Sequence, residues 1–137
     1  MNIRFPHAVI GVLALWGSAA AAESWVNVDV LPGGFALQID MATKVEEMDG
    51  VKLVERATFR KQLPTATIET TVAVDCAGET AKTRSVKMIS DGKVVSDNTN
   101  NAAQYVPVHF GSAEAMYYKA LCGKPVSDAG GGAPAAQ

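Results

Sequence analysis

The sequence predicts an α+β fold in which an antiparallel sheet of about six strands is covered on one face by a C-terminal helix. Three observations lead to this fold class. Apolar and polar residues alternate along several short segments, which is the pattern of half-buried strands. A single helical pattern follows Ser112. The two cysteines, Cys76 and Cys122, lie at the end of the clearest strand pattern and in that helix.

Residues 1–22 have the three-part layout of a secretory signal peptide. Arg4 supplies the positive charge, Ala8–Trp16 is an uncharged apolar run, and Ala20 and Ala22 occupy the A-x-A positions. The alternative is a membrane anchor, but spanning a bilayer takes about 20 apolar residues and this run is about half that length. No cysteine follows the run to carry a lipid, so we expect a periplasmic or secreted protein that is not lipid-anchored.

The chain has 137 residues, a length typical of one domain, and a formal net charge of −2. It lacks the concentrated positive charge that drives binding to phosphates, so we expect no nucleic-acid partner. After the signal, no hydrophobic run is long enough to span a membrane. We therefore expect one domain over residues 23–125. The Gly- and Ala-rich tail, residues 126–137, has nothing to bury and is expected to be disordered.

The first strands are predicted directly after the signal. Residues 25–30 alternate apolar and polar, and the Pro-Gly-Gly sequence at 32–34 predicts a turn. The next strand pattern ends at Asp40, and the pattern of residues 41–48 is ambiguous. A turn at 49–50 then leads into a long strand whose apolar face carries Val51, Leu53, Ala57 and Phe59.

The clearest strand pattern spans residues 66–76 and places Cys76 on its buried side, with Val72 and Val74. Two further strands, 80–89 and 93–95, are joined by Asp-Gly, which is typical of a type I′ hairpin turn. The polar residues 97–104 predict a loop, and residues 105–109 predict one more short strand.

The helix has local start and stop signals. Ser112 is a candidate N-cap, Glu114 lies in the first turn, and Gly123 and Pro125 stop the pattern. Because the apolar face of the sheet must be covered and this helix is the only candidate cover, we expect it to pack there. Tyr117 and Tyr118 are either exposed recognition aromatics or core residues of this helix.

Cys76 and Cys122 predict a disulfide between sheet and helix, because cysteine pairs in oxidising compartments are most simply bridged. The bridge would close a loop of about 46 residues, for which chain entropy contributes about 4 kcal/mol of stability. The alternatives are weaker. There is no C-x-x-C motif, and a zinc site would have only His109 to join the two thiols.

We see no catalytic constellation in the sequence. One histidine after the signal cannot build a Ser-His-Asp triad or a two-histidine metal site within one chain. The adjacent carboxylates Glu46 and Glu47 are typical of a solvated surface. We therefore expect no enzyme, no metal and no cofactor. The alternative is a hydrolase whose carboxylates meet only in the folded chain.

Two basic rows are candidate binding residues. If their strands are neighbours, they form a positive patch suited to an acidic protein segment or a polyanion. The alternative is that these charges only solvate the sheet and protect its edges. The rows are Lys52, Arg56 and Arg60, followed by Lys82, Arg84 and Lys87.

The order of these features resembles the surface-adhesin protein E family, small exported proteins of Gram-negative bacteria. The resemblance implies a six-stranded sheet with a helix tethered by the disulfide, adhesion to host matrix proteins, and a homodimer. It suggests Lys82 and Arg84 as contact residues. The matching features are Trp25, Ile39-Asp40, Val74-Asp75-Cys76, Asp91-Gly92-Lys93-Val94-Val95, Val106-Pro107-Val108, Gly111-Ser112 and Leu121-Cys122.

Our expectation is thus a non-enzymatic exported binding protein that contacts host or envelope proteins as an adhesin-like module. The alternative is a periplasmic protein that binds a small or lipidic ligand between sheet and helix.

Overall fold

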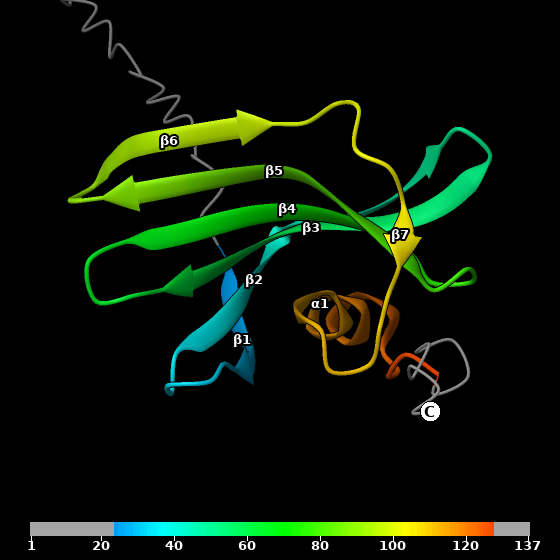
Figure 1. The fold of residues 1–137 in the computed structure, drawn as a ribbon, viewed down its shortest axis with the longest axis horizontal. Coiled ribbons are helices and arrows are strands. Elements are labelled where there is room, and N and C mark those ends of the chain that lie inside the picture. The colour runs from blue at the N-terminus through cyan, green and yellow to red at the C-terminus, as the bar shows by residue number, and fades with distance from the viewer. Residues whose placement is uncertain (1–23, 128–137) are drawn as a thin grey trace, which may run out of the picture.

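The structure, a computed structural model, describes residues 24–127, which form seven strands and one helix. Strands β1 to β6 pair antiparallel with their neighbours in chain order, and β7 pairs with the start of β5 (Figure 1). The predicted signal peptide and residues 128–137 of the predicted tail lie outside the described residues. The elements are β1 (Trp25–Val30), β2 (Ala36–Asp49), β3 (Lys52–Gln62), β4 (Thr67–Asp75), β5 (Thr80–Ser90), β6 (Lys93–Thr99), β7 (Val106–Pro107) and α1 (Ala113–Cys122).

Helix α1 lies against one face of the sheet, which we call the inner face; the opposite face is the outer face (Figure 1). The helix contacts β3 and β4, the middle of the sheet. Burial of these apolar side chains supplies the main favourable free energy of folding. The buried core residues are Leu37, Ile39, Ala57, Phe59, Val72, Val74, Ala81, Val108, Tyr118, Leu121 and Val126.

The helix begins and ends where its local signals predict. Ser112 is the N-cap, and its hydroxyl oxygen accepts the backbone N–H of Ala115 at 3.3 Å. Gly123 takes the left-handed conformation, with φ of 71°, and its N–H donates to the carbonyl of Lys119 at 3.0 Å. Both ends therefore depend on short-range contacts that do not involve the sheet.

A disulfide joins Cys76, the residue after β4, to Cys122, the last residue of α1, with Cα atoms 5.6 Å apart. Beside it, the hydroxyl of Tyr118 donates to the carbonyl of Cys76 at 2.9 Å. Tyr118 is fully buried, and its neighbour Tyr117 packs on Phe59 with ring centroids 4.6 Å apart. The predicted fold class and the predicted disulfide are confirmed.

Two strands are longer than the sequence predicts. β2 does not end at Asp40 but continues to Asp49 after an irregularity in its pairing with β3 between Asp40 and Val45. β6 runs to Thr99, so its last residues pair with β5 where we expected a loop. The added residues of β2 and β6 show no clear apolar alternation in the sequence. The helix packs on β3 and β4, so these segments need no apolar face to bury against it.

The β2–β3 hairpin extends beyond β4, and this overhang corrects the predicted apolar face of β3 (Figure 1). Val51 is 96% exposed and Leu53 is 53% exposed, whereas Val54, on the other side of the strand, is 1% exposed. The helix does not reach the overhang, so its inner face has no cover. Val54 is opposite Glu47 on the outer face, where Glu47 pairs with Arg56 and Arg84.

The expectation that nothing is buried after Pro125 is wrong for Val126. Its side chain is 4% exposed and belongs to the core. Ser127 then donates both its N–H and its hydroxyl to the carboxylate of Glu79, the residue before β5. The domain therefore extends at least two residues past the predicted boundary.

Candidate binding surface on the outer face

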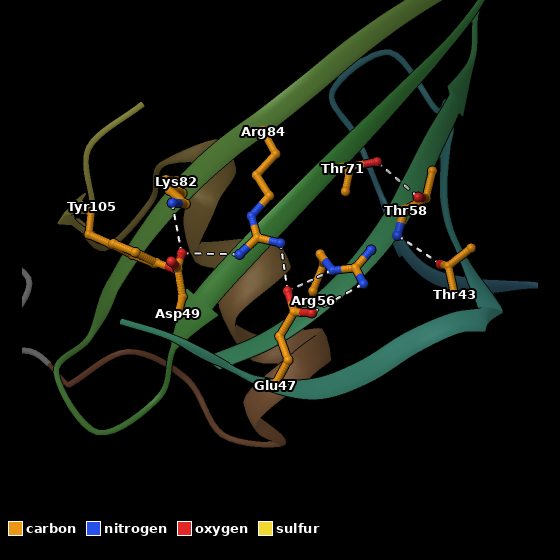
Figure 2. Close-up of polar contacts among 9 residues, drawn as sticks. All are labelled: Thr43, Glu47, Asp49, Arg56, Thr58, Thr71, Lys82, Arg84 and Tyr105. Carbon is orange, nitrogen blue, oxygen red and sulfur yellow. Dashed lines mark hydrogen bonds and ion pairs between the residues drawn. The ribbon is translucent and has the colours of Figure 1, made fainter. Parts of the chain in front are cut away.

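A cluster of ion pairs joins β2, β3 and β5 on the outer face (Figure 2). Glu47 accepts from Arg56 at 2.8 Å and from Arg84 at 2.6 Å. Asp49 accepts from Lys82 at 2.7 Å and from Arg84 at 3.0 Å. Arg84 therefore bridges both carboxylates. We call Glu47, Asp49, Arg56, Lys82 and Arg84 the ion-pair cluster.

Tyr105 closes one end of the ion-pair cluster (Figure 2). Its hydroxyl donates to Asp49 at 2.6 Å, and the ammonium of Lys82 lies 4.7 Å from the centre of its ring. Lys52 approaches the same ring at 5.4 Å, so two cations face one aromatic ring. Because Tyr105 precedes β7, these contacts hold the β6–β7 segment against the sheet.

The cluster fixes the charge of its members at neutral pH. Hydrogen bonds from Arg56 and Arg84 hold the pKa of Glu47 below its ordinary value of 4.5. Hydrogen bonds from Lys82 and Tyr105, together with Arg84, hold the pKa of Asp49 well below its usual range. Burial, together with the bond to Asp49, raises the pKa of Tyr105 to about 12. Both carboxylates are therefore ionised and the phenol is neutral.

The structure brings the two predicted basic rows together only in part. Strands β3 and β5 are not neighbours, because β4 lies between them. Across β4, Arg56 and Lys82 are both in register with Ala73, and this small residue leaves room for long side chains to meet above it. The two rows thus share the outer face without forming an uninterrupted positive patch.

Most of the predicted basic residues already have a partner within the chain. Lys52 pairs with Asp75 at 3.2 Å. Arg60 donates to the side chain of Gln38 at 2.7 Å, and its guanidinium lies 4.2 Å from the centre of the Trp25 ring. An acidic partner would compete with these contacts, and with the carboxylates of the ion-pair cluster. That the rows recruit such a partner stays a prediction.

Sequence reasoning missed the acidic half of the cluster. Glu46 is exposed, as we expected of a solvated surface, but Glu47 is partly buried and ion-paired. The available signal was the spacing of Glu47 and Asp49, which places both on one face of a strand. It was missed because residues 41–48 were not assigned to a strand. Tyr105 gave no signal, because its partners lie far away in the sequence.

Large apolar side chains are exposed at the end of the β2–β3 hairpin. Met48 and Leu53 are opposite each other in register and are 61% and 53% exposed. Val51, in the turn between them, is 96% exposed. We call these three residues the hairpin tip. It belongs to the same hairpin as Asp49, but Met48 and Leu53 point to the inner face, whereas Glu47 and Asp49 point to the outer face and the ion-pair cluster.

A second apolar feature lies at the flank of α1. A cavity of about 420 Å³ is lined by Val30, Phe110, Met116, Pro125 and Val126, among others. Phe110 is 70% exposed there. The space directly between helix and sheet is filled by buried core side chains, so this flank is where a ligand next to the helix would fit.

Within residues 24–127, no three His, Cys, Asp or Glu side chains are grouped to hold a metal ion. In the same part of the chain, no helix has the length and apolar character needed to cross a membrane.

The described residues define an α+β domain with one antiparallel sheet, a helix over one face only, and a disulfide between them. Comparisons with protein-family models, with curated proteins and with solved structures gave no match. The resemblance to the surface-adhesin protein E family therefore stays a prediction from the sequence.

Proposed function

We propose that this chain is a non-enzymatic exported binding protein that contacts a host or envelope protein through the hairpin tip and the ion-pair cluster. The observation that carries the proposal is the exposure of Met48, Val51 and Leu53 on an overhang of the sheet. Protein interfaces combine an apolar centre with polar groups around it. Here the apolar tip and the ion-pair cluster lie on opposite faces of one hairpin, so the partner would enclose the end of this hairpin.

The order within the ion-pair cluster supports the same proposal. Arg84 is held by two carboxylates, at 2.6 and 3.0 Å, so its side chain has little conformational freedom left to lose on binding. Arginine is also enriched at protein interfaces. A partner that encloses the end of the hairpin would meet these groups already in position on its outer face.

Two observations support export. The disulfide is compatible with an oxidising compartment, where such bonds persist. The pattern of residues 1–22 predicts the signal that would direct the chain there.

The test uses the exported protein with its disulfide intact and measures binding to immobilised extracellular-matrix and envelope proteins by biolayer interferometry. The variant Met48→Gln/Val51→Thr/Leu53→Thr should bind at least about tenfold more weakly, because an interface loses its apolar centre. The matched control is Val94→Thr/Val95→Thr, which changes exposed apolar residues on β6. Equal affinity of the hairpin variant and the wild type, for every protein bound, would refute the proposal.

The basic rows are tested separately with Arg60→Glu and Lys87→Glu, which lie outside the ion-pair cluster. If an acidic partner binds the rows, each reversal weakens binding while circular dichroism stays unchanged. Unaltered affinity in both variants would remove these residues from the interface.

The cavity at the flank of α1 favours a second candidate, binding of a small apolar ligand. The probe is the fluorescent dye 1-anilinonaphthalene-8-sulfonate. Met116→Trp fills the cavity and should abolish the rise in dye fluorescence, whereas Met41→Trp, at an exposed strand position, should not. An equal rise in both variants would exclude this cavity as the site.

A further inference from the structure

A polar hollow of about 190 Å³ lies on the outer face and is not part of the ion-pair cluster. One residue from each of the first five strands contributes to its lining: Trp25, Asp40, Thr58, Thr71 and Ser85. The hollow is smaller than the roughly 300–1,000 Å³ of pockets for drug-sized molecules. Its size suits a single small ring.

The five lining residues form one continuous row across the sheet. In the strand register, Trp25 is opposite Asp40, Asp40 is opposite Thr58, Thr58 is opposite Thr71, and Thr71 is opposite Ser85. Side chains that are directly opposite each other in an antiparallel sheet lie on the same face. The row therefore presents an indole, a carboxylate and three hydroxyls side by side.

The irregularity in β2 explains why the sheet is hollow here. Between Asp40 and Val45 the pairing of β2 with β3 is interrupted. The hydroxyl of Thr43 takes the place of a backbone partner: it accepts the N–H of Thr58 at 2.9 Å (Figure 2). The same hydroxyl donates to the carbonyl of Asp40 at 2.7 Å. The backbone is thus satisfied while β2 bends away from β3.

The groups in the hollow have unused hydrogen-bonding capacity. The hydroxyls of Thr58 and Thr71 are 3.0 Å apart, and one O–H serves that bond, so the other remains available (Figure 2). Among residues 24–127, the hydroxyl of Ser85 has no hydrogen-bond partner. The residue Asp40 is 7% exposed; its Oδ1 accepts two backbone N–H groups, and its Oδ2 receives no donor from the described residues.

The next row across the sheet is polar as well. It runs through Asn27, Gln38, Arg60, Glu69 and Lys87, each opposite the next in register. Glu69 and Lys87 also line the hollow. Amide, guanidinium and carboxylate groups thus border the hydroxyl row, with both signs of charge in alternation.

We infer that this hollow binds one ring of a neutral saccharide, which lies across the strands. The hydroxyls of a sugar ring both donate and accept, as do the three hydroxyls of the row, and the C–H face of a sugar packs on an aromatic ring. The indole of Trp25 supplies that ring, and Arg60, 4.2 Å from its centre, holds it in place. The site is therefore ordered before the ligand arrives.

The charges in the hollow argue against the other ligand classes. A polyanion would meet the carboxylates of Asp40 and Glu69, and an apolar ligand would leave buried polar groups without partners. Lys87 and Arg60 offset the two carboxylates, so the local charge is close to neutral. A neutral, hydroxyl-rich ligand satisfies the polar groups without adding charge.

The experiment is isothermal titration calorimetry of the exported protein with neutral tetrasaccharides of glucose, galactose, mannose and N-acetylglucosamine, and with a heparin tetrasaccharide. We expect saturable binding of at least one neutral tetrasaccharide. Thr71→Val keeps the shape of the side chain and removes its hydroxyl, so it should weaken that binding about tenfold. The matched control, Thr83→Val, makes the same change at a residue opposite Val72 and should leave affinity within about twofold.

The hairpin variant Met48→Gln/Val51→Thr/Leu53→Thr should bind the saccharide like the wild type, which separates this site from the proposed protein interface. No heat of binding from any neutral tetrasaccharide at about 10 mM would overturn the inference. So would binding of the heparin tetrasaccharide alone, or equal losses in Thr71→Val and Thr83→Val.

Discussion

Replacement of both cysteines, in the variant Cys76→Ser/Cys122→Ser, measures how far the free energy of unfolding depends on the tether between helix and sheet. The disulfide spans a sequence separation of 46 residues. For a loop of that length, the chain-entropy model gives about 4 kcal/mol at 25 °C. Tyr118 and Leu121 still bury their side chains against the sheet, so the loss arises mainly from the greater freedom of the unfolded chain.

A loss of about 4 kcal/mol is a large part of the roughly 5–15 kcal/mol that stabilises a typical domain. With a urea dependence of about 2 kcal/mol per molar, the midpoint of unfolding should fall by about 2 M. The assay is urea titration followed by far-ultraviolet circular dichroism. The oxidised wild type, the reduced wild type and the double variant are compared, and the last two should agree.

The control is Ala77→Ser, which adds a hydroxyl at an exposed position beside the bridge and should leave the midpoint unchanged. A shift of less than about 0.5 M in the double variant, with an unchanged slope, would refute the reasoning. It would mean that the bond does not restrict the unfolded chain to the extent that the chain-entropy model requires.

Three further predictions follow from single contacts. Tyr118→Phe removes the donor to the carbonyl of Cys76 and should lower the free energy of unfolding by about 1 kcal/mol in the same titration; an unchanged midpoint would contradict it. Phe59→Ala empties a fully buried site and should cost about 3–5 kcal/mol, and a loss below about 1 kcal/mol would show that the core collapses around the gap. The pKa values of Glu47 and Asp49 are lower in the folded state than in the unfolded chain. The stability that these two carboxylates contribute is therefore fully present at a pH above their pKa values in the unfolded chain, and it is lost as the pH falls through their pKa values in the folded state. The thermal midpoint should therefore decrease below about pH 4.5, and less so in Glu47→Gln/Asp49→Asn; parallel curves would rule out this cause.

The sequence predicted best those elements whose signals are local. β4 alternates along its length, so Val72, Val74 and the position of Cys76 could be assigned without knowledge of any other strand. The helix was predicted from Ser112 and Gly123 because caps act within a few residues.

Burial on β3 could not be predicted in the same way. Leu53 and Val54 have similar apolar character, yet the first is exposed and the second buried. Alternation gives the two faces of a strand, but burial depends on what lies over each face. The helix does not reach the inner face of the overhang, where Leu53 lies. On the outer face, Val54 is opposite the ion-paired Glu47.

Only the basic half of the ion-pair cluster was predicted from the sequence. Basic residues on a strand stand out in a sequence, so Arg56, Lys82 and Arg84 were found. Their partner Asp49 is 35 residues away from Arg84, and Tyr105 is 56 residues away from Asp49, so the neutralising contacts could not be read from spacing.

By itself, the sequence determined the class of fold, the positions of most strands along the chain, the ends of the helix and the cysteine pair, because periodicity, caps and turns act over short stretches of chain. Only the tertiary structure decided which face of each strand is covered, how β2 bends at Thr43, and which carboxylates neutralise the basic rows. Those properties depend on contacts between residues that are distant in the chain, and the free energy of such contacts exists only once the sheet has assembled.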